Sequence, residues 1–288
     1  MEKFVLFIFM LLTLCACNDN PKPKDPPRKQ GGNVAKKDSI SDSPQANLKN
    51  FETDKIKDTL KLDNGLVIKW ITKGSGNTLL NGEVVLIEYR LSLPDGKIVD
   101  GNEHAKLPFI PFIVGFNMQT LGWDMALTKL RVGDFVKVEM PQQLAHGEKG
   151  IPGVIPPNSD NWLYLKIKAR VTPEYNLNGV KTWTFAEGTE TESFSGRLNE
   201  IVYNVIASTA SNPEVINTYR AKFPLKYISG QKNVVPGLEK VLSKVKKGQK
   251  IYVLLEPNQA YGDRGYVNIV KPNEAVFYNI SVKDIRPI

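Results

Sequence analysis

One sequence pattern occurs twice in this chain, and the repeat constrains the fold more than any other feature. A set of glycine, alanine, proline and asparagine residues recurs unchanged 115 positions later, without a gap. The apolar positions between Phe112 and Leu165 recur at the same spacing. Because turn residues and core positions repeat together, we expect one domain to be folded twice. The identical pairs are Gly115/Gly230, Gly122/Gly237, Gly133/Gly248, Ala145/Ala260, Gly147/Gly262, Gly150/Gly265, Pro157/Pro272 and Asn158/Asn273.

Composition supports two ordinary domains and narrows their chemistry. The length of 288 residues, with 41% apolar and 24% charged residues, is typical of globular protein. The net charge of +8 comes without a stripe of Lys and Arg between aromatic residues, so we do not expect nucleic acid as a partner. The only cysteines, Cys15 and Cys17, lie before the repeats. We therefore expect no disulfide, metal or cofactor in either domain.

Residues 1–16 have the pattern of a signal peptide. Met1-Glu2-Lys3 gives a charged start, and an apolar run follows from Phe4 to Leu14. As a helix this run would be about 16 Å long, too short for a bilayer core of about 30 Å. We therefore expect an export signal and not a membrane span.

The end of the apolar run resembles the bacterial lipobox. Leu14-Cys15-Ala16-Cys17 places a small residue before Cys17, and the resemblance implies cleavage there and attachment of diacylglycerol to Cys17. It also implies a bacterial cell-envelope location, lipid-anchored to a membrane and facing the periplasm or the exterior. A plain secretory signal with incidental cysteines is the alternative. Residues 17–50 are polar and rich in proline, so we expect a disordered tether after the anchor cysteine.

Each repeat predicts several strands and one short helix. In the first, strands are expected at 84–89, 109–114, 135–139 and across Leu163 to Ile167, with a helix from near Gln119 to Gly133. The second predicts strands at 201–206, 225–229, 251–255 and 276–280, and a helix through Leu238. Such a series favours an α+β fold in which an antiparallel sheet curves around one helix. The domains are expected at 51–172 and 173–288.

The ordered motifs of the first repeat resemble the FKBP family of peptidyl-prolyl cis/trans isomerases. Two tandem FKBP-like domains are therefore implied. The motifs are Tyr89, Asp95-Gly96, Val99-Asp100, Pro108-Phe109, Gly122-Trp123, Leu144-Ala145-His146-Gly147 and the loop from Gly150 to Asn158. In the second repeat the carrying residues are Val235-Pro236-Gly237-Leu238, Ala260-Tyr261-Gly262 and Lys271-Pro272-Asn273.

The resemblance implies a proline-binding pocket in the first domain. Trp123 would form the floor and Asp100 the acidic edge, and the backbone at Thr120 would hold a substrate carbonyl. Val99 and His146 stand where the family has an aromatic residue and a tyrosine. The walls and remaining contacts would come from Tyr89, Phe109, Val154, Ile155 and Leu163.

The second repeat departs further from the family pattern. Leu238 replaces the floor tryptophan, Asn217 aligns with the acid and Leu225 with Phe109, while Tyr261 keeps the loop tyrosine as a substrate contact. We therefore expect the first domain to be catalytic and the second to have a degenerate pocket.

An apolar pocket can catalyse prolyl rotation without a nucleophile. The barrier of about 18–20 kcal/mol comes from amide resonance, which is lost in the twisted transition state. An apolar environment disfavours the planar, more polar amide, which lowers the barrier.

The leading hypothesis is a membrane-anchored prolyl isomerase that assists the folding of exported proteins. Its expected partners are Xaa-Pro segments of those proteins and macrolide-type ligands. A non-catalytic chaperone or assembly-adaptor lipoprotein is the alternative, and an accessory lipoprotein of a motility or secretion machine is a third possibility.

Overall fold

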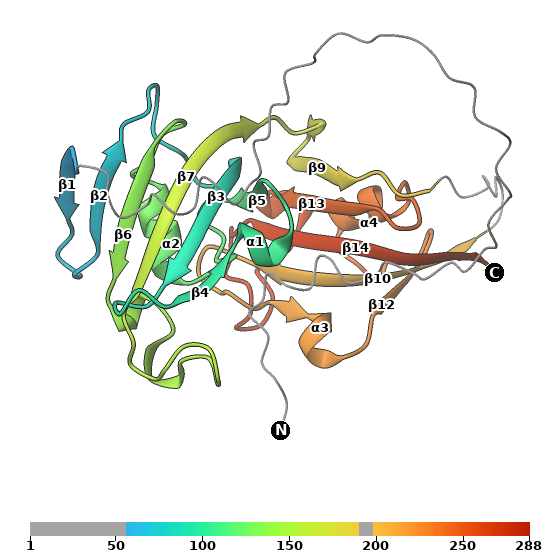
Figure 1. Cartoon of the computed structure of the whole chain (residues 1–288). Coiled ribbons are helices and arrows are strands. Elements are labelled where there is room, and N and C mark those ends of the chain that lie inside the picture. Colours follow the sequence, from blue (N-terminus) through green and yellow to red (C-terminus); the bar gives the residue numbers. More distant parts are fainter. Residues whose placement is uncertain (1–55, 190–197) are drawn as a thin grey trace, which may run out of the picture.

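The computed structural model describes residues 56–189 and 198–288, which form two seven-stranded antiparallel sheets (Figure 1). The predicted signal peptide, Cys17 and the tether lie outside these residues. Each sheet is packed against one seven-residue helix, which confirms the α+β fold of two tandem domains. Within the described residues, no helix is long and apolar enough to cross a membrane.

The first sheet has the strand order β1-β2-β6-β7-β3-β4, and β5 pairs with β3. Its strands are β1 (Asp58–Lys61), β2 (Val67–Thr72), β3 (Val84–Ser92), β4 (Ile98–Gly101), β5 (Ile110–Ile113), β6 (Phe135–Met140) and β7 (Asn161–Val171); its helices are α1 (Asn102–Ala105) and α2 (Leu121–Leu127), with short 3₁₀ turns at η3 (Gln142–Leu144) and η4 (Gly147–Lys149).

The second sheet has the order β11-β10-β14-β13-β9-β8, with β12 on β10. Its elements are β8 (Tyr175–Leu177), β9 (Val180–Ala186), β10 (Asn199–Ser208), β11 (Ile216–Asn217), α3 (Thr218–Ala221), β12 (Leu225–Ile228), α4 (Pro236–Leu242), β13 (Lys250–Leu255), η5 (Pro257–Gln259) and β14 (Val276–Pro287).

The predicted strands are confirmed, but the predicted helix is too long. α2 begins at Leu121 and ends at Leu127. The backbone N–H groups of Lys129 and Leu130 bond to carbonyls only three residues back, so the last turn tightens and the helix stops before Gly133. The short strands β1, β4, β8 and β11 and the one-turn helices α1 and α3 were not predicted, because each is too short to show a period.

Two of the repeated glycines hold the helix and the long loop close to the sheet. A Cβ on Gly122 would lie 2.7 Å from the Met140 sulfur, and one on Gly237 would lie 2.6 Å from Leu255 Cδ2. The repeated asparagines close the loop, since the N–H groups of Asn158 and Asn273 each donate 2.9 Å bonds to a glycine carbonyl. These residues recur because both copies need the same close approaches and the same loop closure.

Strand register refines the repeat. On β3, Leu91 pairs with both Asp100 and Leu163. On β10, Ala207 holds the same place between Ile216 and Tyr278. The offset is therefore 116 residues before β5 and β12 and 115 after them, because the loop from α1 to β5 is one residue longer than the loop from α3 to β12.

The two domains share a hydrophobic cluster. β5 of the first domain lies beside β13 of the second (Figure 1), and the Tyr252 hydroxyl donates a 3.0 Å bond to the Pro111 carbonyl. The Asn117 amide donates 2.8 and 3.1 Å bonds to the carbonyls of Thr209 and Ala210. The cluster, which we call the interdomain core, contains Val84, Ile113, Phe116, Trp183, Tyr252, Leu254 and Phe277.

The matching sheet face of the first domain is charged. Lys137, Glu139 and Trp162 occupy the places that Tyr252, Leu254 and Phe277 hold in the second domain. Lys137 Nζ lies 3.3 Å from the Trp162 ring centroid, and Glu139 is 3.2 Å from Lys137 and 2.6 Å from Lys69. The same fold thus presents a polar face in one copy and a docking face in the other.

Candidate active site in the first domain

Trp123 lies at the centre of an aromatic group on the inner face of the first sheet. α2 carries its side chain inward, where only 2% of it is exposed. Its ring stacks on Phe112, with centroids 5.6 Å apart and planes 9° apart, and Tyr89 meets it edge-on at 5.1 Å. Trp123 is therefore part of a buried aromatic group, and its role as a pocket floor stays a prediction.

A buried hydrogen bond joins Tyr89 to Asp100. The Tyr89 hydroxyl donates to Asp100 Oδ2 at 2.7 Å, and Asp100 Oδ1 accepts the Gly101 N–H at 2.8 Å. Burial raises the pKa of the Asp100 carboxyl, although these two bonds and His104, 3.6 Å away, oppose the shift. Burial, together with the Asp100 charge, also raises the pKa of Tyr89, so its hydroxyl keeps the proton that it donates.

Four more predicted residues join this group. Ile155 and Leu163 are buried in the same hydrophobic core as Trp123 and Tyr89, and half-buried Val99 and Val154 pack against that core. The structure therefore brings together an apolar group with one buried acid at its edge.

Phe109 does not belong to the group, contrary to the expected wall position. It lies before β5 with 37% of its surface exposed, and Lys168 Nζ is 5.1 Å from its ring centroid. Ile110 takes the inward position instead, being 5% exposed and paired with Ile87 on β3. Ile110, one position later, thus holds the place expected of Phe109.

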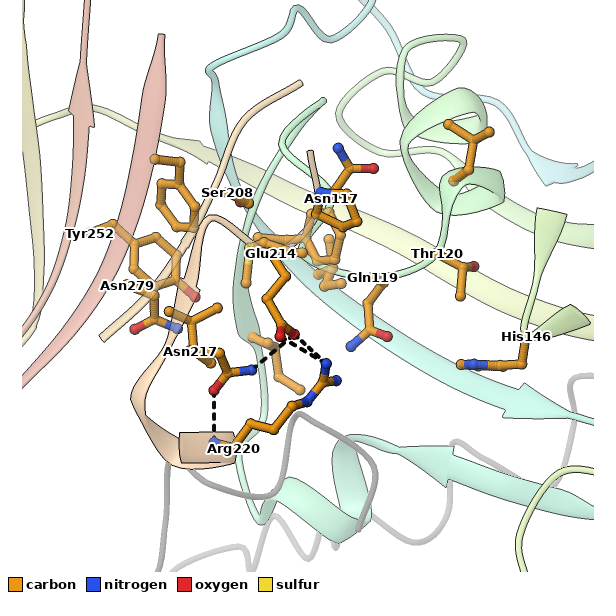
Figure 2. Close-up of a pocket in the computed structure, with 18 residues that line it drawn as sticks. Asn117, Gln119, Thr120, His146, Ser208, Glu214, Asn217, Arg220, Tyr252 and Asn279 are labelled. Atoms are coloured by element: carbon orange, nitrogen blue, oxygen red, sulfur yellow. Dashed lines mark hydrogen bonds and ion pairs between the residues drawn. The ribbon is translucent and has the colours of Figure 1, made fainter. Parts of the chain in front are cut away.

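Thr120 and His146 line a cavity of about 510 Å³ between the two domains (Figure 2). Ile110 and Gln119 line it as well, although neither was predicted as a site residue. Burial lowers the pKa of His146, so its imidazole is neutral at pH 7. Within the described chain, Thr120 Oγ1 is buried without a hydrogen-bond partner. The lining that the first domain gives to this cavity therefore contains no charged side chain.

In the second domain Tyr261 is half-buried, and its ring stacks on Tyr266 with centroids 5.0 Å apart. Burial raises the pKa of the Tyr261 hydroxyl. No aromatic floor lies nearby on α4, because Leu238 occupies that place. The predicted contact residue thus stands apart from the group around Trp123.

Register corrects two pairings between the domains. Asp100 corresponds to Ile216 and not to Asn217, because both face the same rung of the sheet. Asn217 instead caps α3, where its Oδ1 accepts the Arg220 N–H at 3.1 Å. Leu225 corresponds to Ile110 and not to Phe109, since each pairs with the matching residue of the central strand.

Two further replacements follow from the same register. Val205 stands in the place of Tyr89, and Tyr278 stands in the place of Leu163. Because Val205 and Ile216 replace Tyr89 and Asp100, the second domain has lost the buried tyrosine–acid pair as a unit. Across the described residues, no group of three or more His, Cys, Asp or Glu side chains is placed to hold a metal ion.

A model of the family described as FKBP-type peptidyl-prolyl cis-trans isomerase matches residues 76–169 and 192–283. The chain belongs to this family. Its relatives include FK506-binding protein 4 of Rhizopus delemar, 37% identical over 99 residues, or 34% of this chain and 25% of that protein. The peptidyl-prolyl cis-trans isomerase Fkbp12 of Drosophila melanogaster is 36% identical over 96 residues, 33% of this chain and 88% of that protein. The chain therefore spans a quarter of the fungal protein and most of the insect one.

Among solved structures, the three FKBP domains of wheat FKBP73 align over 77% of this chain and 95% of that one, with 19% identity and a TM-score of 0.38. The double match of the family model agrees with the two sheets described above.

Proposed function

We propose that the first domain is a prolyl isomerase whose pocket is built on Trp123, Tyr89 and Asp100. The observation that carries the proposal is the buried Tyr89–Asp100 hydrogen bond beside the Trp123 ring, a combination replaced in the second domain. Membership of the isomerase family supports the same reaction class.

The arrangement suits a reaction driven by the environment of the substrate. A proline ring against Trp123, Ile155 and Leu163 would leave water, and its amide would lose the solvation that favours the planar form. His146 is neutral and adds no charge near the bound amide, so it does not replace the solvation that favours the planar form. The chain's own residues thus bind the ring, exclude water and hold the flanking chain.

The clients we propose are Xaa-Pro segments of exported polypeptides, met at a bacterial membrane to which Cys17 anchors the protein. Support comes from the charged start, the short apolar run and the Ala16-Cys17 junction. Macrolide-type ligands are proposed for the same pocket, since the names of several relatives record binding of FK506. Replacing Cys17→Ser should move the protein from the membrane to the soluble fraction, and continued membrane retention would count against a lipid anchor.

The catalytic proposal is tested on the full chain with a short Xaa-Pro peptide. Trp123→Leu, which copies the residue of the second domain, should lower kcat/KM at least about tenfold, the equivalent of about 1.4 kcal/mol of transition-state stabilisation. Leu238→Ala is the matched control in the second domain and should leave kcat/KM unchanged. Circular dichroism checks that both variants are folded. A wild-type chain that does not exceed buffer at micromolar concentration would favour the non-catalytic alternative.

The second domain is the best candidate for that alternative role. Val205, Ile216 and Leu238 leave it without the tyrosine, acid and tryptophan of the first pocket. We propose that it holds or positions polypeptide and does not turn it over, as a chaperone or adaptor module does.

A further inference from the structure

The cavity between the domains has walls from both copies of the fold (Figure 2). Its volume of about 510 Å³ lies within the range of about 300–1,000 Å³ that is usual for ligand sites. The first domain contributes Ile110, Gln119 and Thr120, and the second contributes Ile206 and Asn217. Neither domain alone encloses this space.

The cavity continues the candidate active site. Thr120 lies three residues before Trp123, and His146 opens the loop that ends beyond Ile155. Both Thr120 and His146 line the cavity, whereas Trp123 and Ile155 lie buried behind them. Phe112, whose ring stacks on Trp123, also lines the cavity. A polypeptide with its proline at the Trp123 group would therefore extend past Thr120 into the space beside the second domain.

The lining matches an extended polypeptide. Ile110, Ile206 and Phe277 provide an apolar floor, which suits an apolar side chain. Backbone N–H and C=O groups need partners of both kinds, and the amides of Gln119 and Asn217 can donate and accept. The buried Thr120 hydroxyl, which has no partner in the described structure, is a further group that a bound backbone would satisfy.

An ion pair of the second domain lines the polar side of the cavity. Arg220 Nη1 lies 2.6 Å from Glu214 Oε2, and the Asn217 amide donates to the same carboxylate at 3.4 Å. Figure 2 shows Arg220 between Glu214 and the Gln119 side chain. The exposed side chains of Arg220 and Leu121 leave this edge open to solvent, so a chain can enter there.

We propose that the second domain completes the substrate site of the first. Apolar residues that flank the proline pack against Ile206, and the backbone beside them bonds to Asn217 and the Glu214–Arg220 pair. This inference rests on the proposed function of the first domain. It gives the degenerate copy a part in choosing longer, apolar Xaa-Pro segments over short peptides.

Two peptides test the proposal on the full chain: a tetrapeptide with one Leu-Pro bond, and a ten-residue peptide with the same bond flanked by Val and Leu. We expect the longer peptide to have about tenfold higher kcat/KM, which corresponds to about 1.4 kcal/mol. The double variant Glu214→Ala/Arg220→Ala should abolish this gain, so that the two peptides have the same kcat/KM. The matched control, Glu200→Ala/Lys226→Ala, removes another exposed ion pair of the second domain, with its atoms 3.0 Å apart and away from the cavity, and should keep the gain.

A photo-crosslinker beside the proline of the longer peptide gives a readout independent of turnover. We expect crosslinks to residues 206–220 of the second domain. Crosslinks confined to the first domain, or a gain that survives the Glu214/Arg220 variant, would overturn the proposal. A wild-type chain that does not turn over the tetrapeptide would instead reject the catalytic proposal. The crosslinks would still show where the longer peptide binds.

Discussion

The two domains differ at the residues of the group around Trp123, while the frames around that group are the same. Tyr89, Asp100 and Trp123 of the first domain become Val205, Ile216 and Leu238 in the second. At one position the second domain has the larger side chain, because Tyr278 stands in the place of Leu163. The fold therefore accepts either set of side chains. The aromatic group around Trp123 with its buried acid belongs to one copy and is not required by the architecture.

The largest effect is expected where the two sheet faces differ. Tyr252→Ala removes a fully buried ring and its bond to Pro111 from the interdomain core, so the free energy of unfolding should fall by about 4 kcal/mol. Lys137→Ala, at the matching place in the first domain, should cost at most about 1 kcal/mol. Urea denaturation measures both. Equal costs would show that the docking face contributes nothing beyond the polar one.

The domains exchange large and small side chains at Trp123/Leu238 and Leu163/Tyr278, so a second substitution should compensate for the first. Trp123→Leu should destabilise the first domain by about 3 kcal/mol, because Tyr89 and Phe112 lose the ring against which they pack. Adding Leu163→Tyr reproduces the combination of the second domain and should restore about half of the loss. Chemical denaturation of the single and double variants gives the coupling. If the losses in free energy of unfolding are additive, the side chains at the two positions do not compensate for each other in size.

An effect of similar size is expected from pH. Asp124 accepts N–H bonds from Gly115 and Asn117, yet burial raises the pKa of its carboxyl from 3.8 to about 6. Folding thus favours the protonated form, and the stability present below pH 4 is lost as the pH rises to 6. The loss amounts to roughly 3 kcal/mol for a shift of this size. The free energy of unfolding of the wild type minus that of Asp124→Asn, measured from pH 4 to 7, should fall by this amount; a constant difference would contradict the shift.

The smallest effect concerns the buried tyrosine–acid pair. Tyr89→Phe keeps the ring against Trp123 but leaves Asp100 without its 2.7 Å donor, which should cost about 2 kcal/mol. The variant Tyr89→Phe/Asp100→Leu removes both polar groups, as the second domain has done, and should recover most of the loss. Thermal unfolding measures the stability of both variants. A double variant less stable than Tyr89→Phe would contradict this prediction, because it would mean that the pair stabilises the fold.

Much of this molecule could be predicted from local sequence patterns. The glycines and apolar positions after Phe112 set the repeat, and the alternation from Phe135 to Met140 set a strand. The group around Trp123 was predicted from the resemblance of these motifs to the FKBP family. The pairing of Phe109 with Leu225 missed one extra residue in a loop, and Asp100 was paired with Asn217 one position too far along the chain. Only strand register reveals both errors.

The interdomain core has a signal in the sequence of β13. Residues 251–255 are apolar without a break, whereas the matching strand of the first domain alternates with Lys137 and Glu139. A continuous apolar run indicates a strand covered on both faces. The identity of the covering surface, Val84, Ile113 and Phe116, could not be predicted, because their partners lie far away along the chain.

The interdomain core joins unlike surfaces, so the contact is head-to-tail and has no symmetry that would close it. Contacts of this kind can in principle add unit after unit into an open-ended stack. The matching surfaces at the two outer ends do not permit it: Lys137 and Glu139 lie at one end, and Glu200, paired with Lys226, stands at the other in the place of Val84. Burying those charges would cost more than the added apolar contact returns. The sequence differences between the copies thus allow the second domain to dock on the first. They also prevent further units from adding at either outer end of the pair.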